Sequence, residues 1–235
     1  MVPFAPNEWP SPELREAAAG LWAWNRAVRN LQLSDAVQQE ARQICRRHDL
    51  PESLLAAQQQ GARIEDGYAV AEELLTYMDT VMGAHAMLLA KLAGERSRWV
   101  EQPVHAFARA VFMTRRLCRI KHDLQAGRLW IPRDVMQQAG VERAHLESGE
   151  VTPGVRRLLW KQVVLARDAY AGCRTLTTDF SGWLRRRFRM AWTRGVHMLA
   201  LIEARRFDVW SRPVELAGFR RAQLYWQVYV GKTFR

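Results

Sequence analysis

The sequence predicts an all-α protein that folds as one domain. Its 235 residues are 49% hydrophobic and 25% charged, which is typical of a globular chain rather than a disordered one. Strong helix formers dominate, and runs of β-branched residues bounded by turns are scarce. A chain of this length buries roughly 70% of its unfolded surface, so one hydrophobic core is sufficient. We expect a helical domain over residues 13–235 and a flexible, proline-interrupted arm over residues 1–12.

Capping residues and hydrophobic periodicity place the individual helices. Ser11 and Ser34 stand where N-caps are expected, and Gly127 stands where a helix ends. The Gly- and Pro-containing stretch 139–154 is predicted to be a surface loop. Helices are expected at residues 12–31, 35–48, 52–61, 68–93, 107–125, 155–176 and 180–206, with one more in the tail after residue 207.

Cysteine usage, the first residues and the net charge narrow the class of protein. Cys45, Cys118 and Cys173 are isolated, which favours a reducing compartment over a disulfide framework or a zinc site. The first residues lack the basic and apolar segments of a secretory signal, so a cytoplasmic location is expected. The net charge of +11 predicts an anionic partner, such as a diphosphate, an acidic membrane surface or a nucleic acid.

The helix at 180–206 carries basic residues beside tryptophans. Arg185, Arg186 and Arg189 lie largely off its apolar stripe. An ordinary solvated face explains this pattern, and we favour that interpretation. Peripheral contact with an acidic bilayer, at the inner membrane surface, stays open as the alternative.

The helix at 68–93 looks like a central core helix. Its small residues, Gly83 among them, allow neighbouring helices to approach closely. His85 fits a buried histidine with satisfied hydrogen bonds better than a metal ligand, because no second ligand stands at metal-binding spacing.

The helix at 107–125 has one apolar side and one charged side. Residues Ala110, Met113, Leu117, Ile120 and Leu124 recur at steps of three and four. On another face, Arg115, Arg119 and Asp123 follow one another four residues apart. By spacing alone, this is a buried helix with a solvated basic edge.

The order of residues in 107–132 also resembles the second aspartate-rich motif of the squalene/phytoene synthase family. That motif reads A-x-Q-x-T-N-x-x-R-D-x-x-x-D, followed by x-x-x-G-R-[VI]-Y-[LI]-P. The residues that match in register are Ala110, Thr114, Asp123, Gly127, Arg128 and Pro132. Trp130 stands where the family has tyrosine.

The departures from the motif concern its charges. Arg115 replaces the family asparagine, Cys118 its arginine, and Arg119 the first aspartate of the DxxxD pair. The helix at 12–31 resembles the first-motif helix, and there the first aspartates fall near Arg29 and Asn30. No DxxxD sequence occurs in the chain.

Other segments extend the resemblance over most of the chain. The stretch 40–61 is similar to the family's "arrhgLP" segment, and 68–93 to its Y-C-x-x-V-A-G-x-V-G helix, with Tyr77, Val81 and Gly83 matching. The resemblance implies a helical bundle of the isoprenoid synthase type, shortened near the N-terminus, as if a helix pair were missing between residues 31 and 35.

The resemblance also implies a site. In the family, two aspartate-rich helices hold Mg²⁺ against prenyl diphosphates. Asp123 is the one retained position that could contact a metal. The diphosphate-binding residues implied here are Arg115, Arg119, Lys121 and Arg128. Tyr77, Val81, Gly83 and Phe112 are expected to line the cavity.

Two arrangements of these charges stay open. In one, Arg119 pairs with Asp123 along the helix and closes the site. In the other, the cations bind an anionic head group directly, since arginine forms bidentate hydrogen bonds with phosphate. Both predict weak or absent condensation of prenyl diphosphates. We expect no cofactor, and Mg²⁺ only if the protein is an active enzyme.

The leading hypothesis is a non-catalytic or weakly catalytic family member. It would bind a prenyl diphosphate or an isoprenoid lipid, or act as an accessory or assembly subunit of a partner protein. The alternative is an active prenyl transferase, using farnesyl or geranylgeranyl substrates at an altered metal site. A basic helical nucleic-acid-binding protein is a third hypothesis, disfavoured because no recognition helix or aromatic sheet motif is present.

Overall fold

The computed structural model describes residues 4–63 and 67–216, and within these ranges the chain is helical without a strand. The all-α prediction is therefore confirmed. The helices are α1 (Pro12–Arg29), α2 (Asp35–Arg47), α3 (Ser53–Gln60), α4 (Ala71–Tyr77), α5 (Ala84–Leu92), α6 (Glu101–Gln125), α7 (Arg133–Gln138), α8 (Arg143–Glu147), α9 (Pro153–Gly172), α10 (Leu176–Asp179) and α11 (Gly182–Ala204).

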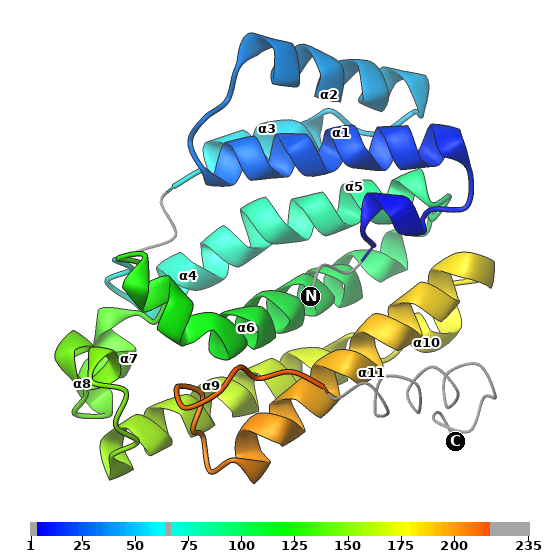
Figure 1. Ribbon diagram of the computed structural model, residues 1–235. Coiled ribbons are helices and arrows are strands. Elements are labelled where there is room, and N and C mark those ends of the chain that lie inside the picture. The colour runs from blue at the N-terminus through cyan, green and yellow to red at the C-terminus, as the bar shows by residue number, and fades with distance from the viewer. Residues whose placement is uncertain (1–3, 64–66, 217–235) are drawn as a thin grey trace.

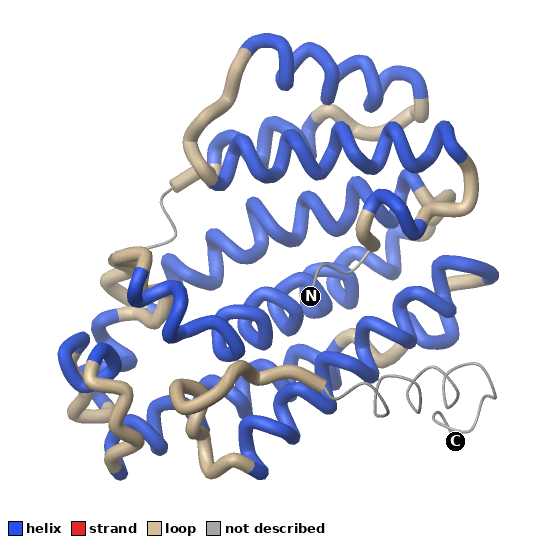
Figure 2. Tube along the Cα trace, in the orientation of Figure 1, coloured by secondary structure: helices blue, strands red, loops and turns tan. Residues whose placement is uncertain are grey.

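The long helices stack in layers, with α6 near the middle (Figure 1). Helix α2 forms one edge, followed by α1 with α3, and then by α4 and α5. Helix α6 packs against α5 on one side and against α9 and α11 on the other. Loops connect the layers at their ends, as the tan segments of Figure 2 show. Among the described residues, no helix combines the length and apolar composition needed to cross a bilayer.

The predicted N-caps form the expected side-chain hydrogen bonds. The Ser11 hydroxyl accepts a hydrogen bond from the Leu14 amide at 3.2 Å, and the Ser34 hydroxyl accepts one from the Val37 amide at 3.4 Å. After α6, Gly127 adopts a φ of +74°, a conformation that glycine adopts without a Cβ clash. These local signals therefore set where the helices begin and end.

Helix α6 begins at Glu101, six residues before the predicted start at Phe107. Pro103 lies in the first turn, where a missing amide hydrogen costs nothing because no intrahelical acceptor is available there.

The long helix predicted at 68–93 begins at Ala71 and includes a π-helical segment at Met78–Gly83, between α4 and α5. A π-helical turn uses i→i+5 hydrogen bonds, so the face that follows is rotated relative to an unbroken α-helix. The segment is stabilised on its polar side, where Arg109 donates two hydrogen bonds of 2.5 Å to the Asp79 carboxylate.

Two predicted irregular segments are more ordered than expected. The stretch 139–154 contains the short helix α8, whose Glu142 amide donates to the His145 ring at 3.0 Å. The arm expected to be flexible is packed where it is described, from residue 4 onward. Trp9 is 1% exposed and its ring lies 4.9 Å from that of Trp183.

The predicted tail helix is not formed over residues 207–216. The Asp208 carboxylate accepts hydrogen bonds from the Trp210 and Ser211 amides and so forms a turn, and Pro213 cannot donate to a helix. The rest of that prediction lies outside the described residues.

Close packing of α9 on α11 depends on Gly195. A Cβ at this position would overlap the hydroxyl of Tyr170. That ring is 1% exposed, and its hydroxyl lies 3.3 Å from the Thr114 hydroxyl in a hydrogen bond. Tyr170 therefore has little room to retreat.

We predict that Gly195→Ala lowers the free energy of unfolding by about 1–3 kcal/mol, because the added methyl overpacks this contact. Gly172→Ala is the matched control, since its Cβ would lie 3.6 Å from that of Ala106, an ordinary contact. Denaturant unfolding of both variants measures the difference. Equal stability of the two variants would show that the contact is looser than described.

Candidate ligand-binding site

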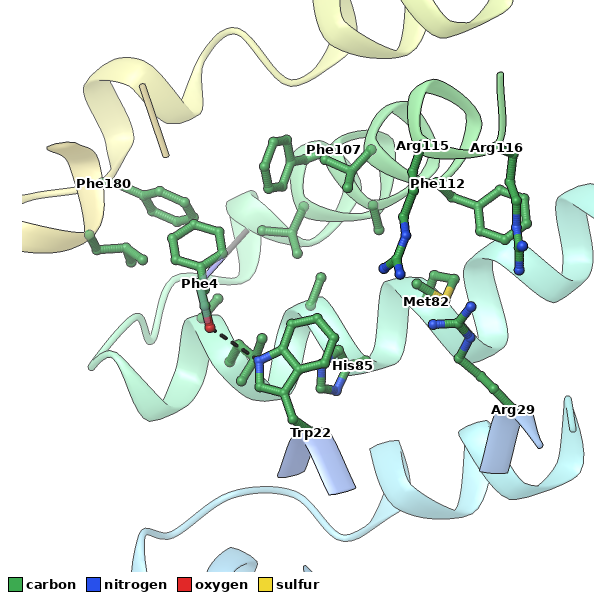
Figure 3. Close-up of a pocket in the computed structure, with 17 residues that line it drawn as sticks. Phe4, Trp22, Arg29, Met82, His85, Phe107, Phe112, Arg115, Arg116 and Phe180 are labelled. Carbon is green, nitrogen blue, oxygen red and sulfur yellow. Dashed lines mark hydrogen bonds between the residues drawn. The ribbon is translucent and has the colours of Figure 1, made fainter. Parts of the chain in front are cut away.

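An apolar cavity of about 70 Å³ lies between α1, α5, α6 and the segment that joins α10 to α11. Figure 3 shows its wall residues. Helix α6 contributes wall residues from Val104 to Arg116, a rise of about 18 Å. One end is lined by rings, including Phe107 and Phe180, and the other by guanidinium groups. The site thus has the polarity of an amphiphile with an anionic head.

Three arginines converge at the polar end: Arg29 from the last turn of α1, and Arg115 and Arg116 from α6 (Figure 3). Burial, followed by the charges of Arg29 and Arg119, lowers the pKa of Arg115 from its usual value. A guanidinium remains charged even so. Within the described residues, Arg115 has no hydrogen bond or ion pair of its own, so its charge is available to a ligand.

The Asp123 carboxylate forms an ion pair that the sequence did not indicate. Arg116 Nη1 lies 3.0 Å from Asp123 Oδ2, and the two side chains are 10% and 6% exposed. They are seven residues apart and therefore share one face of α6 over two turns. The arrangement that paired Asp123 with Arg119 is wrong, because Arg119 is exposed and the carboxylate turns inward to Arg116.

The residues at this end do not fit a Mg²⁺ ion. Mg²⁺ requires oxygen ligands in near-octahedral geometry. The Asp123 carboxylate is bonded to a cation, and on α1 the resemblance places the family's first aspartates near Arg29 and Asn30, neither of which is a carboxylate. In the described ranges, no three His, Cys, Asp or Glu side chains form a group that could hold a metal ion.

The other predicted head-group residues lie outside the cavity. Arg119 and Lys121 line a neighbouring groove of about 570 Å³ between α6, α11 and residues 209–216. Lys121 donates a hydrogen bond of 3.0 Å to the Trp210 carbonyl. Arg128 is exposed and lines neither the cavity nor the groove. Arg115 lines both and so connects them.

Of the four residues expected on the cavity wall, Phe112 is there and three are not. Tyr77 packs against Phe112 with ring centroids 6.0 Å apart. The carbonyl of Val81 accepts a hydrogen bond from Asn25, and Gly83 faces the His105 ring. Met82 of the π-helical segment and His85 of α5 line the cavity instead.

Sequence reasoning missed three features of this wall. Arg29 was aligned with the first motif, but nothing showed that it meets Arg115 across the cavity. Arg116 carried no signal of its own. His85 is buried as predicted, but the expectation of satisfied hydrogen bonds is wrong, because neither ring nitrogen has a partner.

The N-terminal segment closes the apolar end of the cavity. The ring of Phe4 meets those of Phe107 and Trp183 edge-on, at centroid distances of 6.1 and 6.4 Å. Its carbonyl accepts hydrogen bonds from the indole N–H groups of Trp9, at 3.2 Å, and Trp22, at 3.1 Å. With Phe4 in place, the cavity is smaller than the roughly 300–1,000 Å³ of most small-molecule sites.

Solved structures with the same arrangement of helices define the class of this protein. A dehydrosqualene synthase in complex with a ligand superposes with a TM-score of 0.73 at 16% identity, covering 98% of this chain and 91% of that one. YisP from Bacillus subtilis gives 0.75 at 20% identity, covering 94% and 87%. Squalene synthase HpnC from Alicyclobacillus acidocaldarius gives 0.65 at 19% identity, covering 83% and 81%. The chain therefore has the isoprenoid synthase fold.

Sequence comparison gives the family. The profile of the squalene/phytoene synthase family matches residues 9–226. The phytoene synthase of Thermus thermophilus is 33% identical over 104 residues, which is 43% of this chain and 36% of that protein. The chain thus matches about a third of the length of this relative. It belongs to the squalene/phytoene synthase family, as the resemblance of its sequence predicted.

We predict that Asp123→Ala destabilises the protein by about 3 kcal/mol, because it leaves the Arg116 guanidinium buried without its counter-charge. The double variant Arg116→Met/Asp123→Leu should recover most of that loss, since apolar residues can replace a buried pair. Urea unfolding of the wild type and the two variants tests this. A loss below about 1 kcal/mol for Asp123→Ala would mean that the pair is solvated in solution.

Proposed function

We propose that this protein binds a prenyl diphosphate, or a similar anionic isoprenoid lipid, without a metal ion, and that it catalyses condensation weakly or not at all. The observation that carries the proposal is the meeting of arginines at one end of an apolar cavity. Arg115, which has no ion pair in the described part of the chain, is the central residue of this proposal.

The chemistry of the two ends supports such a ligand. Guanidinium groups form paired, charge-assisted hydrogen bonds with phosphate oxygens. The ammonium group of lysine binds phosphate with less specific geometry. Arg119 and Lys121 in the neighbouring groove add positive charge on the solvent side of Arg115. The rings and aliphatic side chains of the wall suit a branched hydrocarbon chain, whose burial is favourable by roughly 25 cal/mol per Å².

The same charges are a poor substitute for Mg²⁺ in catalysis. Prenyl transfer requires extra stabilisation as the diphosphate leaves and its charge grows. Guanidinium groups fixed by packing attract the bound diphosphate and the departing one to a similar extent, and uniform binding does not raise the rate of the chemical step. A role as lipid binder, or as accessory or assembly subunit of a partner protein, therefore fits better than condensation.

A working prenyl transferase is the second candidate, because the family to which the chain belongs consists largely of such enzymes. The two candidates separate in one assay. Incubation with farnesyl or geranylgeranyl diphosphate and Mg²⁺ yields a condensed C30 or C40 product only from the enzyme. A condensed product that forms only with Mg²⁺ would overturn the proposal of a metal-free binder.

We predict that wild-type protein binds farnesyl diphosphate in EDTA, and that Arg115→Ala weakens this binding at least about tenfold, the effect of losing a hydrogen-bonded charge pair. Titration calorimetry in EDTA and in Mg²⁺ measures both affinities. Arg42→Ala removes an exposed guanidinium of α2 that lines no cavity and is the control. Binding that appears only with Mg²⁺, or an equal loss in both variants, would contradict the proposal.

We also predict that Phe4→Ala tightens binding of farnesyl diphosphate several-fold, because a C15 chain must otherwise displace the Phe4 ring. Binding of isopentenyl diphosphate should change less than twofold, since five carbons do not extend to that end of an 18 Å wall. Competition against a labelled prenyl diphosphate gives both values. Equal effects on the two ligands would show that Phe4 does not close the cavity.

A further inference from the structure

His85 is a polar residue in an otherwise apolar stretch of the cavity wall. It is 3% exposed, and neither Nδ1 nor Nε2 has a hydrogen-bond partner in the described structure. The Trp22 ring packs edge-on against it with centroids 4.5 Å apart, which holds the imidazole in position. Both buried ring nitrogens therefore lack a hydrogen-bond partner among residues 4–63 and 67–216.

The protonation state of His85 defines what that partner can be. Burial, and then the charge of Arg29, lower its pKa to about 3, so the ring is neutral at physiological pH. A neutral imidazole carries one N–H donor and one acceptor nitrogen. A buried donor without an acceptor lowers stability, whereas leucine at the same place would not. An unsatisfied histidine here is explained by a bound oxygen that accepts from it.

The position of His85 along the cavity wall indicates which part of a bound ligand it would contact. It follows Met82 by three residues, and both line the cavity. Figure 3 shows Met82 beside the guanidinium groups of Arg29 and Arg115, and His85 between them and the rings of Trp22 and Phe4. An oxygen at His85 is thus one step inside the cavity from the head group. The charge of Arg29 acts on the His85 ring, so the two side chains lie close enough to share one ligand.

Resting on the proposed function, we propose that His85 donates a hydrogen bond to the phosphate attached to the isoprenoid chain, while the arginines bind the terminal phosphate. His85 thereby makes the site selective for a prenyl diphosphate over a prenyl monophosphate. A monophosphate held by the arginines places hydrocarbon beside His85 and leaves its N–H without an acceptor. Neutral imidazole suits the inner position, because it donates to phosphate without adding another buried positive charge.

His85→Leu tests this assignment through two independent readouts. Calorimetry in EDTA compares farnesyl diphosphate with farnesyl monophosphate for wild type and variant. We expect the affinity for the diphosphate to fall about tenfold, as for one hydrogen bond to a charged group, and that for the monophosphate to change less than twofold. Without ligand, the thermal midpoint of the variant should rise by about 2 °C or more, because an unsatisfied polar group is removed.

His197→Leu is the matched control, since His197 is an exposed histidine of α11 that lines no cavity. It should leave both affinities unchanged. An equal loss for both ligands in His85→Leu, or a fall in its thermal midpoint, overturns the assignment and identifies His85 as a structural residue. Absence of any wild-type binding in EDTA overturns the proposed function and the assignment with it. Wild-type binding with unchanged selectivity in His85→Leu overturns the assignment alone.

Discussion

The buried ion pair between Arg116 and Asp123 is the interaction on which the centre of this molecule depends. Helix α6 packs against α5, α9 and α11, and Arg116 and Asp123 are among its buried residues. Two charges in such a helix are tolerated because each neutralises the other at 3.0 Å. With Asp123 engaged in this way, the adjacent Arg115 faces the cavity without a carboxylate to meet it. The charged side chains that line the polar end of the cavity are therefore arginines: Arg29, Arg115 and Arg116.

The charge at this end bears on how the proposed anionic ligand would be held. In the family pattern, carboxylates attract metal ions, and the metal ions attract the diphosphate. Here the positive charges belong to the protein itself, on the same two helices that carry the aspartate-rich motifs. Fixed guanidinium groups bind phosphate with specific geometry, but they cannot follow the charge as it moves during bond cleavage. The family scaffold is retained, and among the described residues the polar end of its cavity is lined by guanidinium groups rather than by a cluster of metal-binding carboxylates.

Two residues of the cavity wall have energetically unfavourable local structure. His85 is buried without a hydrogen-bond partner, and Phe4 adopts a φ of +58°, which is unfavourable for a residue with a Cβ. Both residues line the same cavity. Positive φ angles also occur at Leu31 and Asp49, and other buried polar atoms, such as Trp24 Nε1, lack a partner among the described residues, so these features support a functional site only together with the arginines of the wall. The two features agree with a site that is completed by its ligand rather than by the protein.

The sequence by itself determined the helical class, most helix boundaries and the family. Periodicity, caps at Ser11 and Ser34, and the stop at Gly127 are local signals, and helix formation responds to local signals. It also placed Arg115 and Phe112 at the site, because each stands in a recognisable motif. Only the tertiary structure decided which charges meet. Whether Asp123 pairs with Arg116 or Arg119, and whether Val81 or Met82 of the π-helical segment lines the cavity, depends on helix rotation. A π-helical turn and the packing of neighbouring helices set that rotation. Residue spacing along the sequence assumes an unbroken α-helix and carries no information about its neighbours.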